Sequence, residues 1–165
     1  AALQEHRIDL GLVEGICRLP NLRYTTFLQD ELVAVVHTGS KLSLPDEITP
    51  EDLSRIPLVL RERGSGTLDV FERALSEHNM KLSSLNVLLY LGSTESIKLF
   101  LEHTDCIGIV SIRSISRELL SGTFRVIEIK GMPMLREFCF AQPQGQESGL
   151  SQVLMQFAMH HNKKL

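Results

Sequence analysis

The chain has 165 residues, of which 43% are hydrophobic, and its 17 basic and 20 acidic side chains give a formal net charge of −3. This composition describes a globular chain with room for one domain or two small lobes, and it excludes a disordered chain. Proteins that grip nucleic acid through its phosphates carry a basic stripe. Here only Lys163 and Lys164 stand together near the C-terminus, so we do not expect this chain to bind DNA directly.

Cysteine use and the lack of targeting patterns favour the cytoplasm. Cys17, Cys106 and Cys139 are far apart, have no zinc-type spacing and are odd in number, which argues against a disulfide framework. No apolar run reaches the ~18 residues of a membrane helix. The opening residues, AALQEHRIDLG, show no signal-peptide pattern. We therefore expect a cytoplasmic protein with small buried thiols and no membrane contact.

The first part of the chain reads as a helix end followed by strands. Residues 1–7 are good helix formers, and short apolar or β-rich runs at 8–13, 22–28 and 31–37 indicate strands. The run at 31–37 is nearly continuous, as is typical of a strand buried on both faces. At 49–54 we expect a short helix, because Thr49 can cap it and Pro50 suits its first position.

From residue 57 onward, strand and helix patterns alternate. Strands are expected at 57–60, 86–91, 107–112 and 123–130, and helices at 68–79, 92–102 and 114–120. A strand at 137–142 then precedes an amphipathic helix at 148–161. This alternation predicts an α/β fold with a mostly parallel sheet and helices on both faces.

No catalytic or metal-binding pattern stands out. The chain lacks the GxSxG elbow, the HExxH zinc pattern, and the GxGxxG and GxxxxGK[ST] loops that bind nucleotides. His160 and His161 are adjacent, so on a helix their rings point about 100° apart and make a poor metal clamp. We predict that the chain is not an enzyme and uses no catalytic residue, metal or cofactor.

Two turns of small residues are more informative, at 61–67 (RERGSGT) and at Gly92-Ser93-Thr94. Each follows an apolar strand and precedes a helix, so the first amides of that helix lack internal partners and lie in positive potential. In parallel sheets such turns gather at the carboxyl ends of the strands, where ligands bind. Two of them facing one cleft would suit a small anion. Equally, Ser65, Thr67, Ser93 and Thr94 can be plain helix caps.

Several segments together resemble one family. The run IDLGLVEG at 8–15 is similar to a strand and loop of LysR-type effector domains. The segment LQDELVAVVHTGSKLSLPDEITPEDLSRIPLVLRERGSGT at 28–67 matches the family pattern in order and spacing. GSTESIKLFLEH, IGIV and RELLSGTFRVIEIKG continue that pattern to residue 131. Each piece is weak alone, but several in register identify the chain as similar to the effector-sensing part of LysR-type transcription regulators.

The resemblance implies a two-lobed fold like that of type II periplasmic binding proteins, with mostly parallel, Rossmann-like sheets. Residues 1–36 and 126–165 would form the first lobe and residues 37–125 the second. The family opens with a DNA-binding helix-turn-helix and further first-lobe strands that this chain does not contain. We therefore expect an incomplete first lobe, and exposed apolar surface on it would favour self-association.

The resemblance also implies a site for a small, anionic effector between the lobes. Its residues would be Ser65, Gly66 and Thr67 with Ser93 and Thr94 in the second lobe, and Glu14 and Gly15 in the first. Effector binding would be relayed to DNA through the missing N-terminal domain of a dimeric or tetrameric regulator. The family's usual proline after the 107–110 strand is replaced, with Ser111 at or near its place, so the effector's identity stays open.

Two other functions share the fold. A solute-binding protein of a transport system is the main alternative, although the chain shows no signal peptide and the 28–67 pattern is closer to regulators. An enzyme on a periplasmic-binding-protein-like fold would need a catalytic set, and the sequence offers none. A winged helix-turn-helix encoded upstream would indicate the regulator, and a secretory signal would indicate transport.

Overall fold

The computed structural model describes residues 3, 5, 7–14, 19–145 and 149–162. The chain forms two compact units, which we call unit 1 (residues 1–30 and 136–165) and unit 2 (residues 31–135). The strands β2 (Leu22–His37) and β8 (Met134–Pro143) each contribute residues to both units. The lobe bounds expected from the family resemblance, 1–36 plus 126–165 and 37–125, stay a prediction.

Unit 2 is built on three parallel strands in the order β6-β4-β5. They are β4 (Leu58–Arg61), β5 (Val87–Leu91) and β6 (Ile107–Ser111). The strand at each place was predicted from its short apolar run. A helix connects each strand to the next, which is the connection that parallel strands need. The carboxyl ends of all three strands therefore lie along one edge of the sheet.

The remaining strands make the sheet mixed rather than mostly parallel. β2 pairs antiparallel with β6, with Leu32 opposite Ser111, and antiparallel with β7 (Phe124–Ile129). β3 (Glu47–Ile48) is a two-residue strand parallel to β7. The reason for the difference is that β2 enters unit 2 at the edge where β6 ends, so it must run against β6. The α/β class itself is confirmed.

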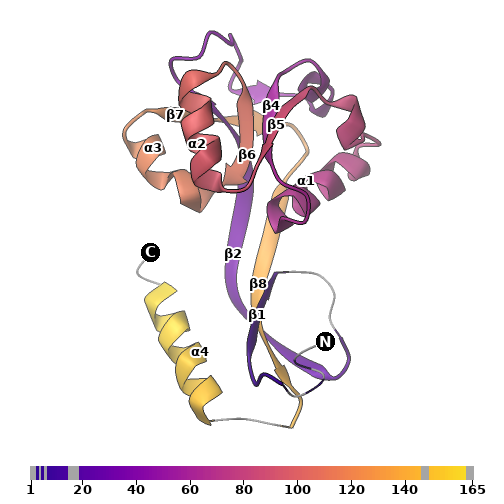
Figure 1. The fold of residues 1–165 in the computed structure, drawn as a ribbon, viewed down its shortest axis with the longest axis vertical. Helices are drawn as coiled ribbons and strands as arrows, with labels where there is room; N and C mark the ends of the chain where they lie inside the picture. Colours follow the sequence, from indigo (N-terminus) through magenta and orange to yellow (C-terminus); the bar gives the residue numbers. More distant parts are fainter. Residues whose placement is uncertain (1–2, 4, 6, 15–18, 146–148, 163–165) are drawn as a thin grey trace. The chain divides into compact units, whose positions relative to one another are not determined.

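Helices cover both faces of this sheet (Figure 1). The helix α1 (Gly66–Glu77) packs on the face of Leu58 and Leu60, and α2 (Thr94–His103) packs on the face of Val59. Further short helices are α3 (Ser116–Leu120), η1 (Pro50–Ser54), η2 (Leu82–Ser84) and η3 (Ile112–Ile115). Successive side chains of a strand point to opposite faces of the sheet. Leu58 and Leu60 of β4 therefore face α1, and Val59 between them faces α2.

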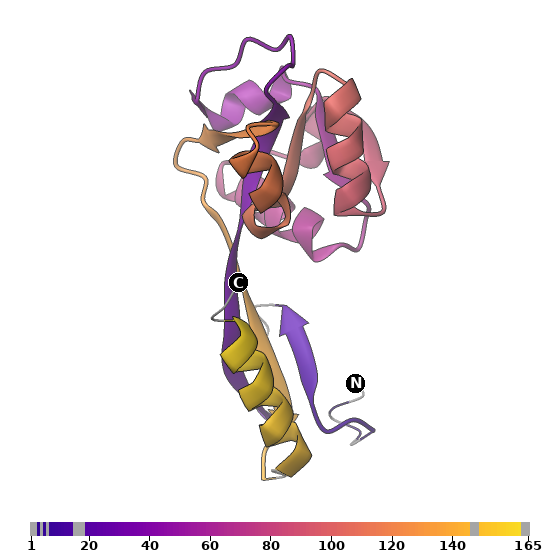
Figure 2. The ribbon, with the colours of Figure 1, turned by 90° about the vertical axis from the view of Figure 1, so that its left-hand side faces the viewer.

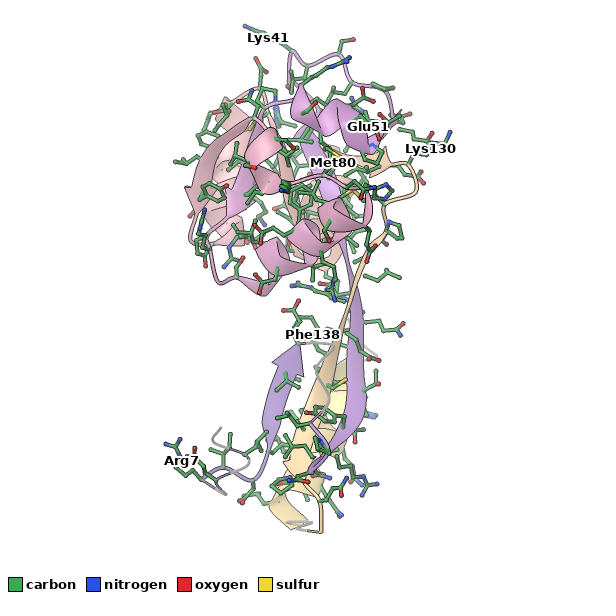
Figure 3. All side chains as sticks on the ribbon, turned by 90° about the vertical axis from the view of Figure 1, so that its right-hand side faces the viewer. Arg7, Lys41, Glu51, Met80, Lys130 and Phe138 are labelled. Atoms are coloured by element: carbon green, nitrogen blue, oxygen red, sulfur yellow. The ribbon has the colours of Figure 1, made fainter. Side chains whose placement is uncertain are left out.

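The side chains of unit 2 divide into buried ones, which pack in its core, and exposed ones. Met80 follows α1 and packs against the cluster that contains Phe71 and Leu75, and Figure 3 shows it among the side chains of unit 2. Lys41, Glu51 and Lys130 point outward in the same view and are exposed.

Thr49 lies before η1 as predicted, and its amide donates to Asp52 Oδ2 over 2.9 Å.

Gly108 allows α2 to lie close to the sheet. A Cβ atom at this position of β6 would meet Ile97 Cγ2 at 2.9 Å and Leu101 Cδ1 at 3.1 Å. Both of these α2 side chains are buried, at 0% and 1% exposure, so neither has room to move away. The spacing between α2 and β6 thus depends on the absence of a side chain at residue 108.

Unit 1 contains β1 (Gly11–Glu14), parts of β2 and β8, and α4 (Gly149–Asn162). β1 pairs antiparallel with β8, from Gly11 opposite Ala141 to Glu14 opposite Phe138. β2 is one continuous strand (Figure 2), although two strands broken at 29–30 were expected. It continues because Asp30, whose side chain is 3% exposed, pairs with Arg136 of the neighbouring β8 at 2.7 Å.

One further expectation for unit 1 was wrong. The described residues 3, 5 and 7 lie in turns or a bend rather than in a helix. Apolar surface was expected to be exposed on this part of the chain, and the apolar stripe of α4 is exposed: Leu150 is 80%, Val153 63%, Leu154 54% and Phe157 60% exposed. Among the described residues of unit 1, Leu3, Leu22 and Ala141 form a small hydrophobic cluster, and Cys139 and Phe140 are also buried, so little core is available to cover that stripe.

We expect Gly108→Ala to destabilise the chain by about 1–3 kcal/mol, because the added methyl group must push α2 away from β6. Urea unfolding followed by circular dichroism measures the change. Gly149→Ala is the matched control, since nothing lies within 4 Å of a Cβ atom there. Equal stability of the two variants would contradict the close packing at residue 108.

We expect the chain to self-associate through the exposed stripe of α4, because association removes apolar surface from water. Sedimentation velocity over a range of protein concentrations should show oligomers, and the double variant Leu154→Gln, Phe157→Gln should shift the chain toward monomer. Leu120→Gln changes a 90% exposed leucine of unit 2 and serves as control. A wild-type chain that stays monomeric at high concentration would contradict this prediction.

Candidate functional site

The two predicted turns begin at adjacent positions of the unit 2 sheet. Arg61 at the end of β4 is the register partner of Leu91 at the end of β5. The ladder continues one step further, because the Glu62 amide donates to the Leu91 carbonyl over 3.1 Å. The turn that leads into α1 and the turn that leads into α2 are therefore neighbours at the carboxyl edge of the sheet.

Both serines act as helix caps. Ser65 Oγ accepts from the Leu68 amide at 3.2 Å, and Ser93 Oγ accepts from the Ser96 amide at 3.1 Å. Ser93 Oγ also shares a hydrogen bond with Ser96 Oγ at 2.8 Å. The capping reading is thus confirmed for these hydroxyl groups, whereas ligand binding by the same turns stays a prediction.

The turn before α1 depends on a glycine. Gly64 has φ +87°, a left-handed conformation that a residue with a side chain rarely adopts. The chain reverses there and places Ser65 at the start of α1. The residues of the two turns differ in solvent exposure. Ser65 and Thr67 are buried, whereas Gly66, Ser93 and Thr94 are half-buried. The part of the site open to solvent is thus Gly66 and the α2 turn.

An arginine links the two turns, and it was not among the predicted site residues. Arg61 forms a two-point ion pair with Glu62, with Nε to Oε2 and Nη2 to Oε1 both at 2.9 Å. Its Nη2 also lies 3.4 Å from the carbonyl of Gly92, the residue before the α2 cap. Only the adjacency of β4 and β5 brings Arg61 to Gly92, 31 residues away, so the sequence held no local signal for this contact.

The ion pair shapes the local charge. Hydrogen bonding to Glu62 raises the pKa of Arg61, and hydrogen bonding to Arg61 lowers the pKa of Glu62. Both groups are therefore charged at neutral pH. The Arg61 side chain is 21% exposed and the Glu62 side chain 42% exposed, so the pair is partly screened by water and each partner is reachable from solvent.

A second ion-pair network fixes the start of α2. Lys98 Nζ contacts Glu95 at 3.0 Å and Glu118 of α3 at 2.7 Å, and it donates to the Ser114 carbonyl over 3.2 Å. Burial opposes the charged form of Lys98, but its hydrogen bonds to Glu118 and Glu95 raise its pKa above the ordinary value. The acidic side chain in the first turn of α2 is therefore neutralised from within unit 2.

The two predicted residues of the other lobe belong to unit 1. Glu14 ends β1, and its Oε1 lies 3.5 Å from Arg136 Nη1. The Arg136 guanidinium stands 4.9 Å from the centre of the Phe138 ring, a residue labelled in Figure 3. Gly15 lies outside the described residues. The structure therefore describes Glu14 as a partner of Arg136 within unit 1.

A hollow of about 320 Å³ lies elsewhere in unit 2. It is lined by residues 31–34 of β2, 126–129 of β7, the turn at 131–134 and Ile112. The hollow lies beside the end of the β2–β7 pairing, at Ala34 and Ile127. Ile112 directly follows β6, so one wall of this hollow reaches the same sheet edge as the two turns. None of the predicted site residues lines it.

Redox and metal chemistry have little support among the described residues. Burial, aided by the charge of Asp105, raises the pKa of the Cys106 thiol to about 11, and Cys106 and Cys139 are both free and buried. In this part of the chain, no three His, Cys, Asp or Glu side chains form a group able to hold a metal ion. Each of its helices is also too short or too polar to span a lipid bilayer.

Comparison with known proteins points to one family. A family model described as the LysR substrate binding domain matches residues 1–163. The chain is 33% identical over 128 residues to YeiE of Escherichia coli K12, an HTH-type transcriptional regulator, and this match covers 78% of the chain and 42% of YeiE. The chain thus spans less than half the length of this relative.

Solved structures show the same fold. The regulatory domain of CcmR from Synechocystis PCC6803, in complex with 2-PG, is similar with a TM-score of 0.79 and 24% identity, over 99% of this chain and 78% of that one. The effector binding domain of QuiR in complex with shikimate has a TM-score of 0.74 and 20% identity, over 99% and 76%. At these identities the likeness establishes the fold alone.

We expect Cys106 to resist alkylation in the folded chain. A thiol pKa of about 11 rather than the ordinary value of 9.0 leaves about 100-fold less thiolate at pH 8. Iodoacetamide labelling read out for the Cys106 peptide by mass spectrometry should be at least that much slower than in urea. Labelling at the unfolded rate would contradict the buried, neutral thiol.

Proposed function

Because the chain belongs to the LysR substrate binding domain family, we propose that it binds a small, anionic effector and regulates transcription through a DNA-binding domain elsewhere in the full-length protein. One observation carries the choice of site. The turns before α1 and α2 lie side by side at the carboxyl ends of the parallel strands β4 and β5.

The chemistry of these turns suits an anion. The first amides of a helix have no carbonyl partner inside that helix, and the aligned peptide dipoles leave positive potential there. Two such ends with Arg61 beside them can neutralise one or two negative charges. Solved domains of this fold were obtained with 2-PG and with shikimate, which are small molecules, and this supports a ligand of similar size here.

The assignment of individual residues is part of the proposal. Ser93, Thr94 and Gly66 are the accessible members of the predicted set, and Ser65 and Thr67 support the site from buried positions. The roles of Glu14 and Gly15 stay predictions drawn from the family resemblance. Effector binding at such a site is typically coupled to a second function by about 1–3 kcal/mol, which is enough to change promoter occupancy.

The wider activity of the protein also belongs to this proposal. YeiE is an HTH-type regulator, and the chain covers only part of its length. We infer that this protein acts as a dimer or tetramer in the cytoplasm, that DNA contacts come from an N-terminal helix-turn-helix domain, and that the chain itself catalyses no reaction. A transport solute-binding protein is not favoured, because the matching family model is that of regulators.

A thermal-shift screen of small carboxylates, phosphorylated acids, amino acids and aromatic acids tests the effector class. A ligand present at 100 times its Kd stabilises the folded state by about 2.7 kcal/mol, which raises the melting temperature clearly. We expect acids to stabilise the chain and neutral or cationic analogues of the same size to have no effect. Stabilisation by neutral compounds alone would contradict an anionic effector.

Substitution of the two turns tests the site. We expect Ser93→Ala and Thr67→Ala to weaken binding of the acid found in that screen, as measured by isothermal titration calorimetry. Loss of the Ser93 cap should itself cost only about 1 kcal/mol of folding free energy.

Thr49→Ala is the matched control, since Thr49 precedes η1 at the opposite, amino end of β4. It should lower stability similarly and leave affinity unchanged. Unchanged affinity in both site variants would return Ser93 and Thr67 to a purely structural role.

A further inference from the structure

The ion pair between Arg61 and Glu62 lies at the proposed site, where Glu62 occupies the guanidinium group that would face an anion. Arg61 shares the strand face of Val59, the face on which α2 packs, and its Nη2 reaches the Gly92 carbonyl at 3.4 Å. Its guanidinium is therefore held beside the start of α2. The two-point geometry, with both distances at 2.9 Å, is the one that a guanidinium adopts with any carboxylate.

We propose that Glu62 is a resident carboxylate that an anionic effector displaces from Arg61 when it binds at the turns before α1 and α2. This inference rests on the proposed function, because it concerns the same site. Arg61 would then determine specificity for negatively charged groups, and Glu62 would act as a built-in competitor that sets the affinity.

The unequal exposure of the two partners supports an exchange. Arg61 is anchored by its strand and by the Gly92 carbonyl and is 21% exposed, whereas Glu62 is 42% exposed and can turn into water. Ion pairs this close to solvent contribute little net stability, so little is lost when one carboxylate replaces another. The incoming group would in addition lie in the positive potential at the starts of α1 and α2.

Neighbouring charges leave Arg61 as the cation best placed for this role. Arg63 is exposed and lies in the turn beyond the strand. Lys98 is already engaged by Glu95, Glu118 and the Ser114 carbonyl. Asp69, in the first turn of α1, is exposed and has no ion pair among the described residues. Removing the negative charge of Glu62 should therefore strengthen anion binding, and removing the positive charge of Arg61 should weaken it.

Titration of the ¹⁵N-labelled full chain with inorganic phosphate at constant ionic strength tests the exchange. The amides of residues 66–68 and 92–96 report binding at the two turns. Compared with the wild type, we expect Glu62→Gln to bind phosphate about fivefold more tightly, the range of an exposed ion pair. Arg61→Gln should bind about fivefold or more weakly. Arg55→Gln is the matched control and should bind as the wild type does, because Arg55 is exposed and lies after η1 at the amino end of β4.

The opposite signs of the two effects separate this role from a structural one. If the pair only held the turns in place, both substitutions would loosen the turns and both would weaken binding. Thermal melting of each variant checks that the fold is kept. Tighter binding by Glu62→Gln together with weaker binding by Arg61→Gln supports the exchange.

Failure of the inference and failure of the proposed function give different results. If phosphate shifts the reporter amides in the wild type but Glu62→Gln binds no more tightly, the exchange is wrong and the anion site stands. If phosphate shifts these amides in none of the proteins, Glu62→Gln included, and no acid in the thermal-shift screen raises the melting temperature, then the exchange and the anion site are both wrong.

Discussion

The parallel pairing of β4 with β5 and β6 is the constraint on which unit 2 depends. Parallel neighbours require crossover connections, and the crossovers here are α1 and α2 on opposite faces of the sheet. Strand ends that point the same way then place the starts of both helices along one edge. The close fit of α2, which Gly108 permits, fixes where its first turn lies relative to β4.

Much of unit 2 could be predicted from the sequence because its elements depend on local patterns. The apolar runs of β4, β5 and β6 and the three- and four-residue spacing of α1 are short-range signals. The two turns were found because glycine and serine are needed where a strand becomes a helix. Even so, α1 begins at Gly66, two residues before the predicted start, because the cap is Ser65 rather than a residue nearer the apolar stripe.

The parts that could not be predicted depend on partners far away in the chain. Asp30 looks like the end of a strand until its buried contact with Arg136, 106 residues later, is known. Arg61 looks like an ordinary turn residue until β5 brings Gly92 beside it. The periodicity of α4 predicted an apolar side for this helix, but periodicity does not show what covers that side.

The position of Glu62 directly after Arg61 has a consequence for selectivity. A carboxylate tethered to its partner by one peptide bond is present at an effective concentration on the order of millimolar or more. An anion that meets only the guanidinium must compete with Glu62 for the same two contacts. A metabolite that contacts the guanidinium and the helix amides together gains binding energy that Glu62 does not have. The neighbouring glutamate would therefore select for acids that make both sets of contacts.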